Sequence, residues 1–121
     1  MNSGEKPFDL RDRTKLFALD VIEVVENLPR TRTADVLGRQ LLRCATSVGA
    51  NTRAAKRAKS NADFISKMGT VEEEADESEF WLELLEKRGL ISPQSASDLR
   101  AEADELVAIV VSSINKAKAK K

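Results

Sequence analysis

The sequence predicts an all-α protein, an antiparallel up-down-up-down four-helix bundle. Apolar side chains recur at spacings of three and four residues in four consecutive segments, which is the pattern of amphipathic helices. Only five Gly and three Pro interrupt the 121 residues. Because the connections between the segments are short, consecutive helices are expected to lie side by side and to run in opposite directions. A chain of this length is expected to form one domain, residues 1–121.

The first helix is expected over about residues 11–28 and the second over about residues 34–58. The first ends before Pro29, because the residue that precedes a proline is disfavoured in helical geometry. Thr33 is the expected N-cap of the second helix. The inner face of the second helix is expected to hold Leu37, Leu41, Cys44, Val48, Thr52 and Ala55.

Small side chains fill the middle of the second helix, residues 45–51. They allow a neighbouring helix to approach closely, although Gly49 costs about 1 kcal/mol of helix stability relative to alanine. Asn51 is expected to lie at the edge of the apolar face and to hydrogen-bond the backbone or another helix. An unpaired amide there would cost about 1–3 kcal/mol, so Asn51 would favour one helix register. Both residues are therefore predicted to be structural.

The third helix is expected over about residues 62–88, capped by Ser60 or Asn61 and ended by Gly89. Its inner stripe comprises Phe64, Met68, Val71, Ala75, Ser78, Leu82 and Leu85.

Ser92 followed by Pro93 predicts the start of the fourth helix, over about residues 93–117, because serine suits the N-cap and proline the first helical position. The lysine-rich end after Asn115 is expected to fray.

Charge is divided between the second and third helices, although the chain as a whole carries a formal net charge of zero. Residues 29–59 hold eight Lys/Arg against one acid, Asp35. Residues 63–87 hold nine Asp/Glu against two lysines. Oppositely charged helices favour binding and assembly over catalysis.

Several classes of function are disfavoured by what the sequence lacks. The chain has no histidine and one cysteine, Cys44, so it has neither a Ser-His or Cys-His pair nor an intramolecular disulfide. Cys44 is expected to be a small buried side chain. We expect no enzyme activity, cofactor or metal site, and no stretch is long and apolar enough for a membrane span. The N-terminal residues lack the apolar core of a signal peptide, so the cytoplasm is the expected location.

The leading candidate for a functional surface is a basic stripe on the outer face of the second helix. It comprises Arg39, Arg43, Arg53 and Arg57, with Lys56 beside it. Arginines at this spacing can contact successive phosphates of a nucleic acid. Two alternatives stay open: ion pairs with acids of the bundle or of a neighbouring subunit, and plain solvation.

A second candidate surface lies on the third helix, where Phe80, Trp81 and Leu84 fall outside the inner stripe. They either complete the core or form an interface between subunits, because large aromatic side chains are typical interface anchors. Glu73 and Glu77 share a face near them and could pair with basic residues of a second copy. A metal site at these glutamates is disfavoured, because bundle sites of that kind also use histidine.

Several motifs together resemble the four-helix bundle proteins encoded in intervening sequences of large-subunit (23S) ribosomal RNA genes. The closest stretch runs from Leu41 to Asn51, and the segment from Glu74 to Leu85 is similar to the family's Glu-Ala-x-Glu-Thr-x-x-Trp-Leu segment. Phe8-Asp9-Leu10, Asn27-Leu28-Pro29 and Gly89-Leu90-Ile91 also match in order and spacing. One departure is Ala54, where the family often has a glutamate.

The resemblance implies more than the residues alone. The family includes the accessory variability determinant of diversity-generating retroelements, which assembles as a pentamer and associates with a reverse transcriptase and nucleic acid. We therefore expect a non-enzymatic, homo-oligomeric accessory or scaffold protein, possible partners being RNA or DNA and a reverse transcriptase. The alternative is a protein-interaction module that does not bind nucleic acid.

Overall fold

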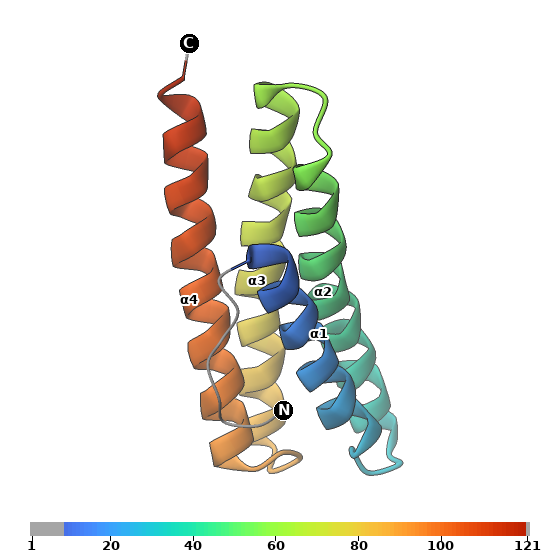
Figure 1. Cartoon of the computed structure of the whole chain (residues 1–121). Coiled ribbons are helices and arrows are strands. Elements are labelled where there is room, and N and C mark those ends of the chain that lie inside the picture. Colours follow the sequence, from blue (N-terminus) through green and yellow to red (C-terminus); the bar gives the residue numbers. More distant parts are fainter. Residues whose placement is uncertain (1–8, 121) are drawn as a thin grey trace.

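The computed structural model describes residues 9–120, and these form four helices. They are α1 (Leu10–Glu26), α2 (Arg32–Lys56), α3 (Asn61–Lys87) and α4 (Pro93–Lys118). Consecutive helices run antiparallel and pack against each other, and α1 also contacts α4 (Figure 1). The predicted all-α up-down four-helix bundle is therefore confirmed. None of the helices within residues 9–120 combines the length and the hydropathy that a membrane span requires.

Each helix begins at a side chain that caps its free backbone N–H groups. Ser60 accepts a hydrogen bond from the Asp63 N–H, and Ser92 accepts one from the Ser95 N–H, as expected. The expectation for α2 is wrong, because its N-cap is Thr31 and not Thr33. Thr31 has extended backbone dihedrals, and its hydroxyl accepts the Ala34 N–H at 3.1 Å, so the helix begins two residues earlier.

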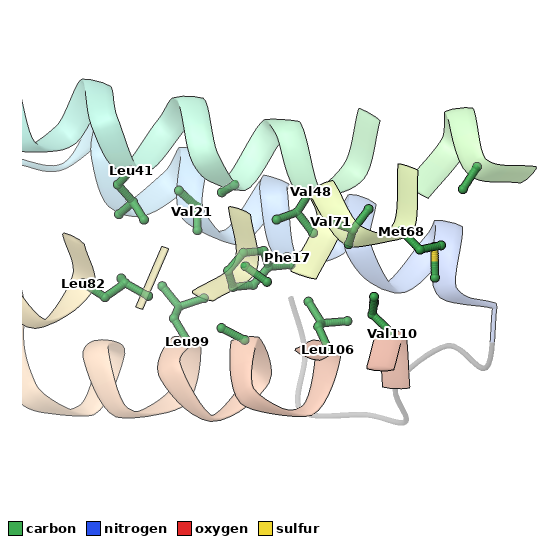
Figure 2. Close-up of a cluster of buried hydrophobic side chains, with 14 of the residues drawn as sticks. Phe17, Val21, Leu41, Val48, Met68, Val71, Leu82, Leu99, Leu106 and Val110 are labelled. Atoms are coloured by element: carbon green, nitrogen blue, oxygen red, sulfur yellow. The ribbon is translucent and has the colours of Figure 1, made fainter. Parts of the chain in front are cut away.

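The core lies between the inner stripes of all four helices (Figure 2). Most residues of the predicted stripes are buried, whereas Leu37 and Phe64 are only half-buried. Buried hydroxyls are paired with carbonyl groups one turn earlier, since Thr52 donates to Val48 at 2.8 Å and Ser78 to Glu74 at 2.8 Å. These pairs remove the desolvation penalty of a buried hydroxyl.

Two glycines of α2 face α1 and the residues that follow it, and their neighbours differ. A Cβ atom on Gly38 would lie 2.8 Å from Cδ1 of Leu28. A Cβ atom on Gly49 would lie 3.6 Å from the Thr14 carbonyl oxygen, an ordinary van der Waals distance. The α1 backbone therefore lies against α2 at Gly49, within the small-residue stretch as expected, whereas Gly38 faces the end of the Leu28 side chain.

The helices differ in length, and this divides the bundle into two ends. α1 has 17 residues, whereas α4 has 26. In Figure 1, α1 begins near the middle of the bundle, so the end with the α2–α3 turn is formed by α2, α3 and α4 among the described residues. The Asn61 side chain donates to the Ala117 carbonyl at 2.7 Å and joins α3 to the last turn of α4 there. Helix α4 extends through Lys118, so the fraying expected after Asn115 is not seen over residues 116–118.

The α3–α4 connection is a tight turn centred on Gly89, whose φ of 71° favours glycine. The Gly89 N–H donates to the Glu86 carbonyl and the Leu90 N–H to the Leu85 carbonyl, both at 2.9 Å. These two bonds form a Schellman motif, so the predicted end of the helix at Gly89 is confirmed.

Candidate functional site

The predicted basic stripe is divided into two parts by the packing of α2 against α3. Arg39 is exposed and pairs with Asp35 of its own helix at 3.1 Å. Arg43 instead reaches across to α3, while Arg53 and Arg57 are exposed and form no ion pair with a described residue. Lys56 is also exposed and forms no ion pair with a described residue. The arginines of the second half of α2 are therefore the ones available to a ligand.

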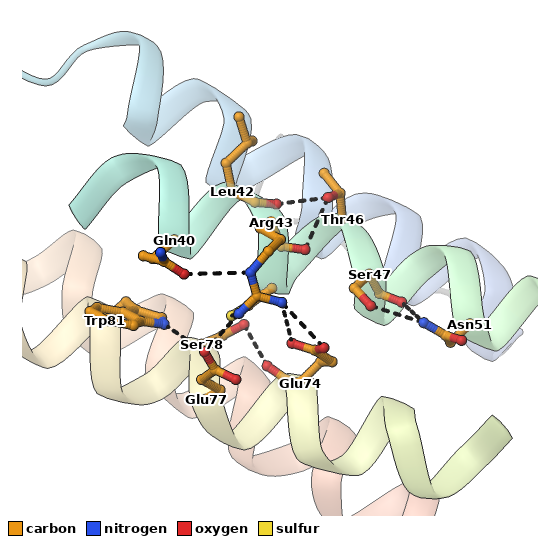
Figure 3. A network of polar contacts seen from close by, with 11 residues as sticks. Gln40, Leu42, Arg43, Thr46, Ser47, Asn51, Glu74, Glu77, Ser78 and Trp81 are labelled. Carbon is orange, nitrogen blue, oxygen red and sulfur yellow. Dashed lines mark hydrogen bonds and ion pairs between the residues drawn. The ribbon is translucent and has the colours of Figure 1, made fainter. Parts of the chain in front are cut away.

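Arg43 is the centre of a polar network between α2 and α3 (Figure 3). Its Nη1 lies 3.3 Å from Glu74, and its Nη2 lies 2.7 Å from Glu77. Nη2 also donates to Sγ of Cys44 at 3.1 Å. These are charge-assisted contacts, so the positive charge of Arg43 is largely neutralised. Sequence reasoning left open an ion pair within the bundle, and the structure places Arg43 in one.

Glu77 completes this network by accepting the indole N–H of Trp81 at 3.1 Å. The indole N–H and the Arg43 guanidinium stabilise the carboxylate and hold its pKa below the ordinary value. Glu77 thus has three partners within the chain, namely Trp81, Cys44 and Arg43, whereas Glu73 is exposed.

The aromatic residues of α3 lie on both sides of the boundary between core and surface. Trp81 is half-buried and packs against the core, while the side chain of Phe80 is 51% exposed. Their rings meet edge to face, with centroids 5.0 Å apart. Leu84 is half-buried one turn further along α3. We call Glu73, Phe80 and Leu84 the outer face of α3.

Cys44 lies beneath Arg43 and close to two carboxylates. The ligand atoms of Cys44, Glu74 and Glu77 lie within 4.8 Å of one another, a grouping that sequence reasoning missed because it depends on the register of α2 against α3. Burial raises the pKa of the Cys44 thiol to about 12, so it stays protonated near neutral pH. Since the Arg43 guanidinium already contacts all three residues, their chemistry is that of an ion pair.

Asn51 and Gly49 have local roles in α2. The Asn51 amide is half-buried and donates to the backbone carbonyl of Ser47 at 3.0 Å and to its hydroxyl at 2.9 Å. Both bonds lie within one helix, so in the described residues Asn51 joins α2 to no other helix. Gly49 faces the α1 backbone at Thr14.

The strongest concentration of positive charge lies at the end of the bundle that holds the α2–α3 turn. Residues 50–69 and 109–120 contain eight Lys/Arg and one acid, Asp63. We call this region the basic end; its basic residues are Arg53, Lys56, Arg57, Lys59, Lys67, Lys116, Lys118 and Lys120. Asp63 pairs with Lys67 at 2.6 Å and accepts the Lys59 N–H at 3.1 Å. The other described residues, 9–49 and 70–108, contain eighteen Asp/Glu and ten Lys/Arg.

The basic end combines residues that sequence reasoning treated separately. The second half of α2 was part of the predicted stripe, whereas Lys116 and Lys118 were assigned to a fraying tail. A helical α4 brings these lysines beside the start of α3, where Asn61, Phe64, Ser113, Lys116, Ala117 and Lys120 line a shallow hollow. The signal in the sequence was the antiparallel order of the helices, which puts the end of α2 and the end of α4 at the same end of the bundle.

A second group of close carboxylates lies between α3 and α4. Burial and the neighbouring Asp104 raise the pKa of Glu79 to about 7, and Asp76 adds to this effect. Arg100 opposes it, and Arg100 also lies 3.5 Å from Glu86. Glu77 and Glu79, two residues apart in α3, therefore have pKa values shifted in opposite directions.

Comparisons with known proteins agree on one family. Residues 7–112 match the model of the 23S rRNA-intervening sequence protein family. The fold is similar to the crystal structure of a protein of unknown function from the S23 ribosomal protein family of Bacteroides thetaiotaomicron, with a TM-score of 0.82 and 33% sequence identity. The similarity covers 88% of this chain and 98% of that one. No curated protein sequence matches the chain. With four helices in the expected order and a family match over most of its length, the chain belongs to the 23S rRNA-intervening sequence protein family.

Proposed function

We propose that this protein is a non-enzymatic, self-associating helical bundle that binds the phosphate backbone of a nucleic acid through its basic end. The supporting observation is the division of charge along the bundle axis, with eight basic residues and one acid at one end. Phosphate contacts by Lys and Arg supply most of non-specific nucleic-acid affinity. The chain as a whole has no net charge, so binding depends on this local concentration.

The proposed contacts are to the backbone and carry little sequence preference. Arg53 and Lys56 lie on the last turns of α2, and Arg57 is its C-cap. Lys116 lies on the last turn of α4 and Lys120 just beyond it. The half-buried Phe64 is the one aromatic residue of the described basic end, and base stacking normally uses several exposed rings. We therefore expect similar affinity for unrelated sequences of equal length.

A salt titration tests this proposal directly. Affinity for a short, unstructured, fluorescently labelled RNA would be measured by anisotropy between about 50 and 200 mM salt. For a single strand, each lost phosphate contact reduces the slope of log affinity against log salt by about 0.7. The triple variant Arg53→Ala/Lys56→Ala/Arg57→Ala should therefore lose about 2 units of slope if all three side chains contact phosphates.

The matched control removes the same number of charges from the opposite end. Arg30, Arg32 and Arg88 are exposed and lie at or beside the α1–α2 and α3–α4 turns. The variant Arg30→Ala/Arg32→Ala/Arg88→Ala should keep both the affinity and the slope. Equal losses in the two triple variants, or affinity that is insensitive to salt, would contradict the proposal.

Self-association is the second part of the proposal and rests on the outer face of α3. Phe80 exposes half of a large aromatic side chain beside Leu84 and the acidic Glu73. Aromatic side chains in such settings anchor interfaces. By its resemblance to the accessory variability determinant, the assembly is proposed to be a pentamer that works with a reverse transcriptase. Light scattering should give a multiple of the 13.3 kDa chain mass, and Phe80→Glu should lower it.

The alternative function is a protein-interaction module that does not bind nucleic acid. It is favoured by the same outer face of α3, because an acidic surface around Phe80 repels polyanions. An oligomer that shows no salt-dependent RNA binding would establish this alternative over the first proposal.

A further inference from the structure

A groove lies at the end of the bundle opposite the basic end, between α1, the α3–α4 turn and the start of α4. Its volume is about 640 Å³, within the range of natural ligand sites. The apolar side chains of its lining are Val24, Leu90, Ile91 and Leu99. The first three are half-buried, so apolar surface stays open to solvent there.

The floor of this groove is held in place by backbone hydrogen bonds. Leu90 donates its N–H to the Leu85 carbonyl in the Schellman motif after α3. Ser92 caps α4 by accepting the Ser95 N–H at 3.1 Å. Leu90 and Ile91 lie between these two fixed points, so a ligand would meet a floor that is already formed. Preorganisation of this kind lowers the entropic cost of binding.

The rim of the groove is acidic. It carries Asp20 and Glu23 from α1 and Asp98 from α4, and we call the site the acid-rimmed groove. Asp98 accepts a hydrogen bond from the Gln94 amide at 2.8 Å. Asp20 and Glu23 form no ion pair with any residue of the described range 9–120. Asp20 is half-buried, and this partial burial raises the pKa of its carboxyl group.

The end of α1 strengthens the negative potential at this rim. The last turn of α1 holds no basic residue, although cations are the residues that suit a helix C-terminus. Glu23 and Glu26 lie there instead, near the end that carries about −0.5 of an elementary charge. The start of α4 adds about +0.5, which three carboxylates outweigh. A cation placed in the groove would therefore reduce the repulsion between these carboxylates and the negative end of α1.

We propose that the acid-rimmed groove binds a basic amphipathic segment of a partner protein. One or two Leu, Ile or Phe side chains of this segment pack on the floor, and flanking Lys or Arg pair with Asp20, Glu23 and Asp98. The negative charge of the rim repels polyanions such as nucleic acid and also anionic lipid surfaces, so neither is the proposed ligand. The lining extends from Asp20 to Asn27, about 10 Å or two helical turns, which suits a short peptide. Docking of this kind follows the helix-in-groove mode.

The probe for this site is a synthetic helical peptide with Leu on one face and Lys on the other. Its affinity for the full chain would be measured by calorimetry, and its site by amide chemical shifts. We expect the shifts to concentrate between Gly89 and Leu99 and on the second half of α1. The variant Asp20→Asn/Glu23→Gln should weaken binding by about tenfold, since each side chain keeps its shape and loses one charge.

Two matched controls separate this groove from general attraction to an acidic protein. The variant Glu72→Gln/Asp76→Asn removes the same charge from α3, outside its outer face, and should change affinity less than about twofold. A peptide with Ser in place of Leu should bind far more weakly to the unmodified chain.

Equal losses in the two double variants, shifts centred on α2 and α3, or no binding of the Leu-Lys peptide would overturn the proposal. So would a groove variant that lowers the oligomeric mass while the peptide fails to compete, because a second copy would then occupy the site. None of these results depends on RNA binding at the basic end.

Discussion

The two halves of α2 carry similar charges, but their neighbours differ. In the first half, Arg39 pairs with Asp35 and Arg43 pairs with two glutamates of α3. In the second half, Arg53 and Arg57 are exposed and form no ion pair with a described residue. Antiparallel packing causes the difference, because it sets the acidic middle and end of α3 beside the start of α2. The acid-poor start of α3 then lies beside the end of α2.

This comparison shows that charge counted per helix is a poor guide to charge on the surface. The sequence predicts a positive α2 and a negative α3, yet the structure separates charge along the bundle axis. The lysines at the end of α4 increase the separation, since they join the basic residues of α2. A ligand would therefore meet one positive end rather than one positive helix.

The largest expected effect comes from a pair of glycine substitutions, one in each half of α2. Gly38→Val should destabilise the fold by about 1–3 kcal/mol, because the site is buried, the Cβ atom would lie 2.8 Å from Cδ1 of Leu28 and 3.5 Å from Cγ1 of Val25, and the two Cγ atoms need further space. Gly49→Ala should stabilise it by up to about 1 kcal/mol, since the Cβ atom has an ordinary contact distance and alanine favours the helix. Urea unfolding measures both changes. Similar effects at the two sites would show that the side chains around Gly38 move aside as easily as the space at Gly49 accepts a methyl group.

The next effect concerns the start of α2. Thr31→Ala should cost about 1 kcal/mol, because it removes the acceptor for the Ala34 N–H. Thr33→Ala should change the free energy of unfolding by less than about 0.5 kcal/mol, since Thr33 is exposed and within the helix. The two variants carry the same substitution two residues apart, so thermal unfolding of both decides which threonine is the cap.

The comparison extends to α3, where Glu79 faces α4. Its pKa of about 7 exceeds the ordinary 4.5, so the folded state binds an extra proton between these values. Stability should therefore fall as pH rises from about 4.5 to 7. Glu79→Gln should stabilise the protein by up to about 1 kcal/mol near pH 8 and have little effect near pH 4. Thermal unfolding at both values measures this, and Glu73→Gln serves as the exposed control.

The smallest expected effect is the loss of the Arg43 network. Arg43→Ala should lower the melting temperature by only a few degrees, because exposed ion pairs contribute little. The variant should also raise the pKa of Glu77, which Trp81 and Arg43 hold below its ordinary value. Because a lowered carboxyl pKa stabilises the fold above that pKa, Arg43→Ala should be less sensitive to acid.

The readout for Arg43 is Trp81 fluorescence during acid titration, since the indole donates to Glu77. Arg53→Ala is the matched control from the other half of α2 and should leave the titration unchanged. An identical response in the two variants would mean that Arg43 and Glu77 do not form a working pair.

Local signals made most of the fold predictable. Ser92 before Pro93 and Gly89 after a helical stripe determine backbone conformation within a few residues, so both were read correctly. Thr31 and Thr33 are equally good capping residues, and only the length of the connection after Pro29 chooses between them. That length depends on how α1 packs against α2, which is a tertiary property.

The candidate sites were less predictable, because they depend on which residues become neighbours. The pairing of Arg43 with Glu77 requires the register of α2 against α3, which the sequence pattern leaves open. The acid-rimmed groove combines Asp20 and Asp98, which are far apart in the chain. The lysines at the end of α4 were predicted to fray, because a lysine-rich terminus has no apolar stripe that indicates a helix. Ala117, however, is buried and keeps that last turn against α3.

The position of Cys44 has a practical consequence. It is the single thiol of the chain, it is fully buried, and Arg43 lies over it. A maleimide can reach the sulfur only when α2 and α3 separate. The rate of labelling therefore measures how often α2 and α3 separate locally. The natural chain can report this opening without an engineered cysteine.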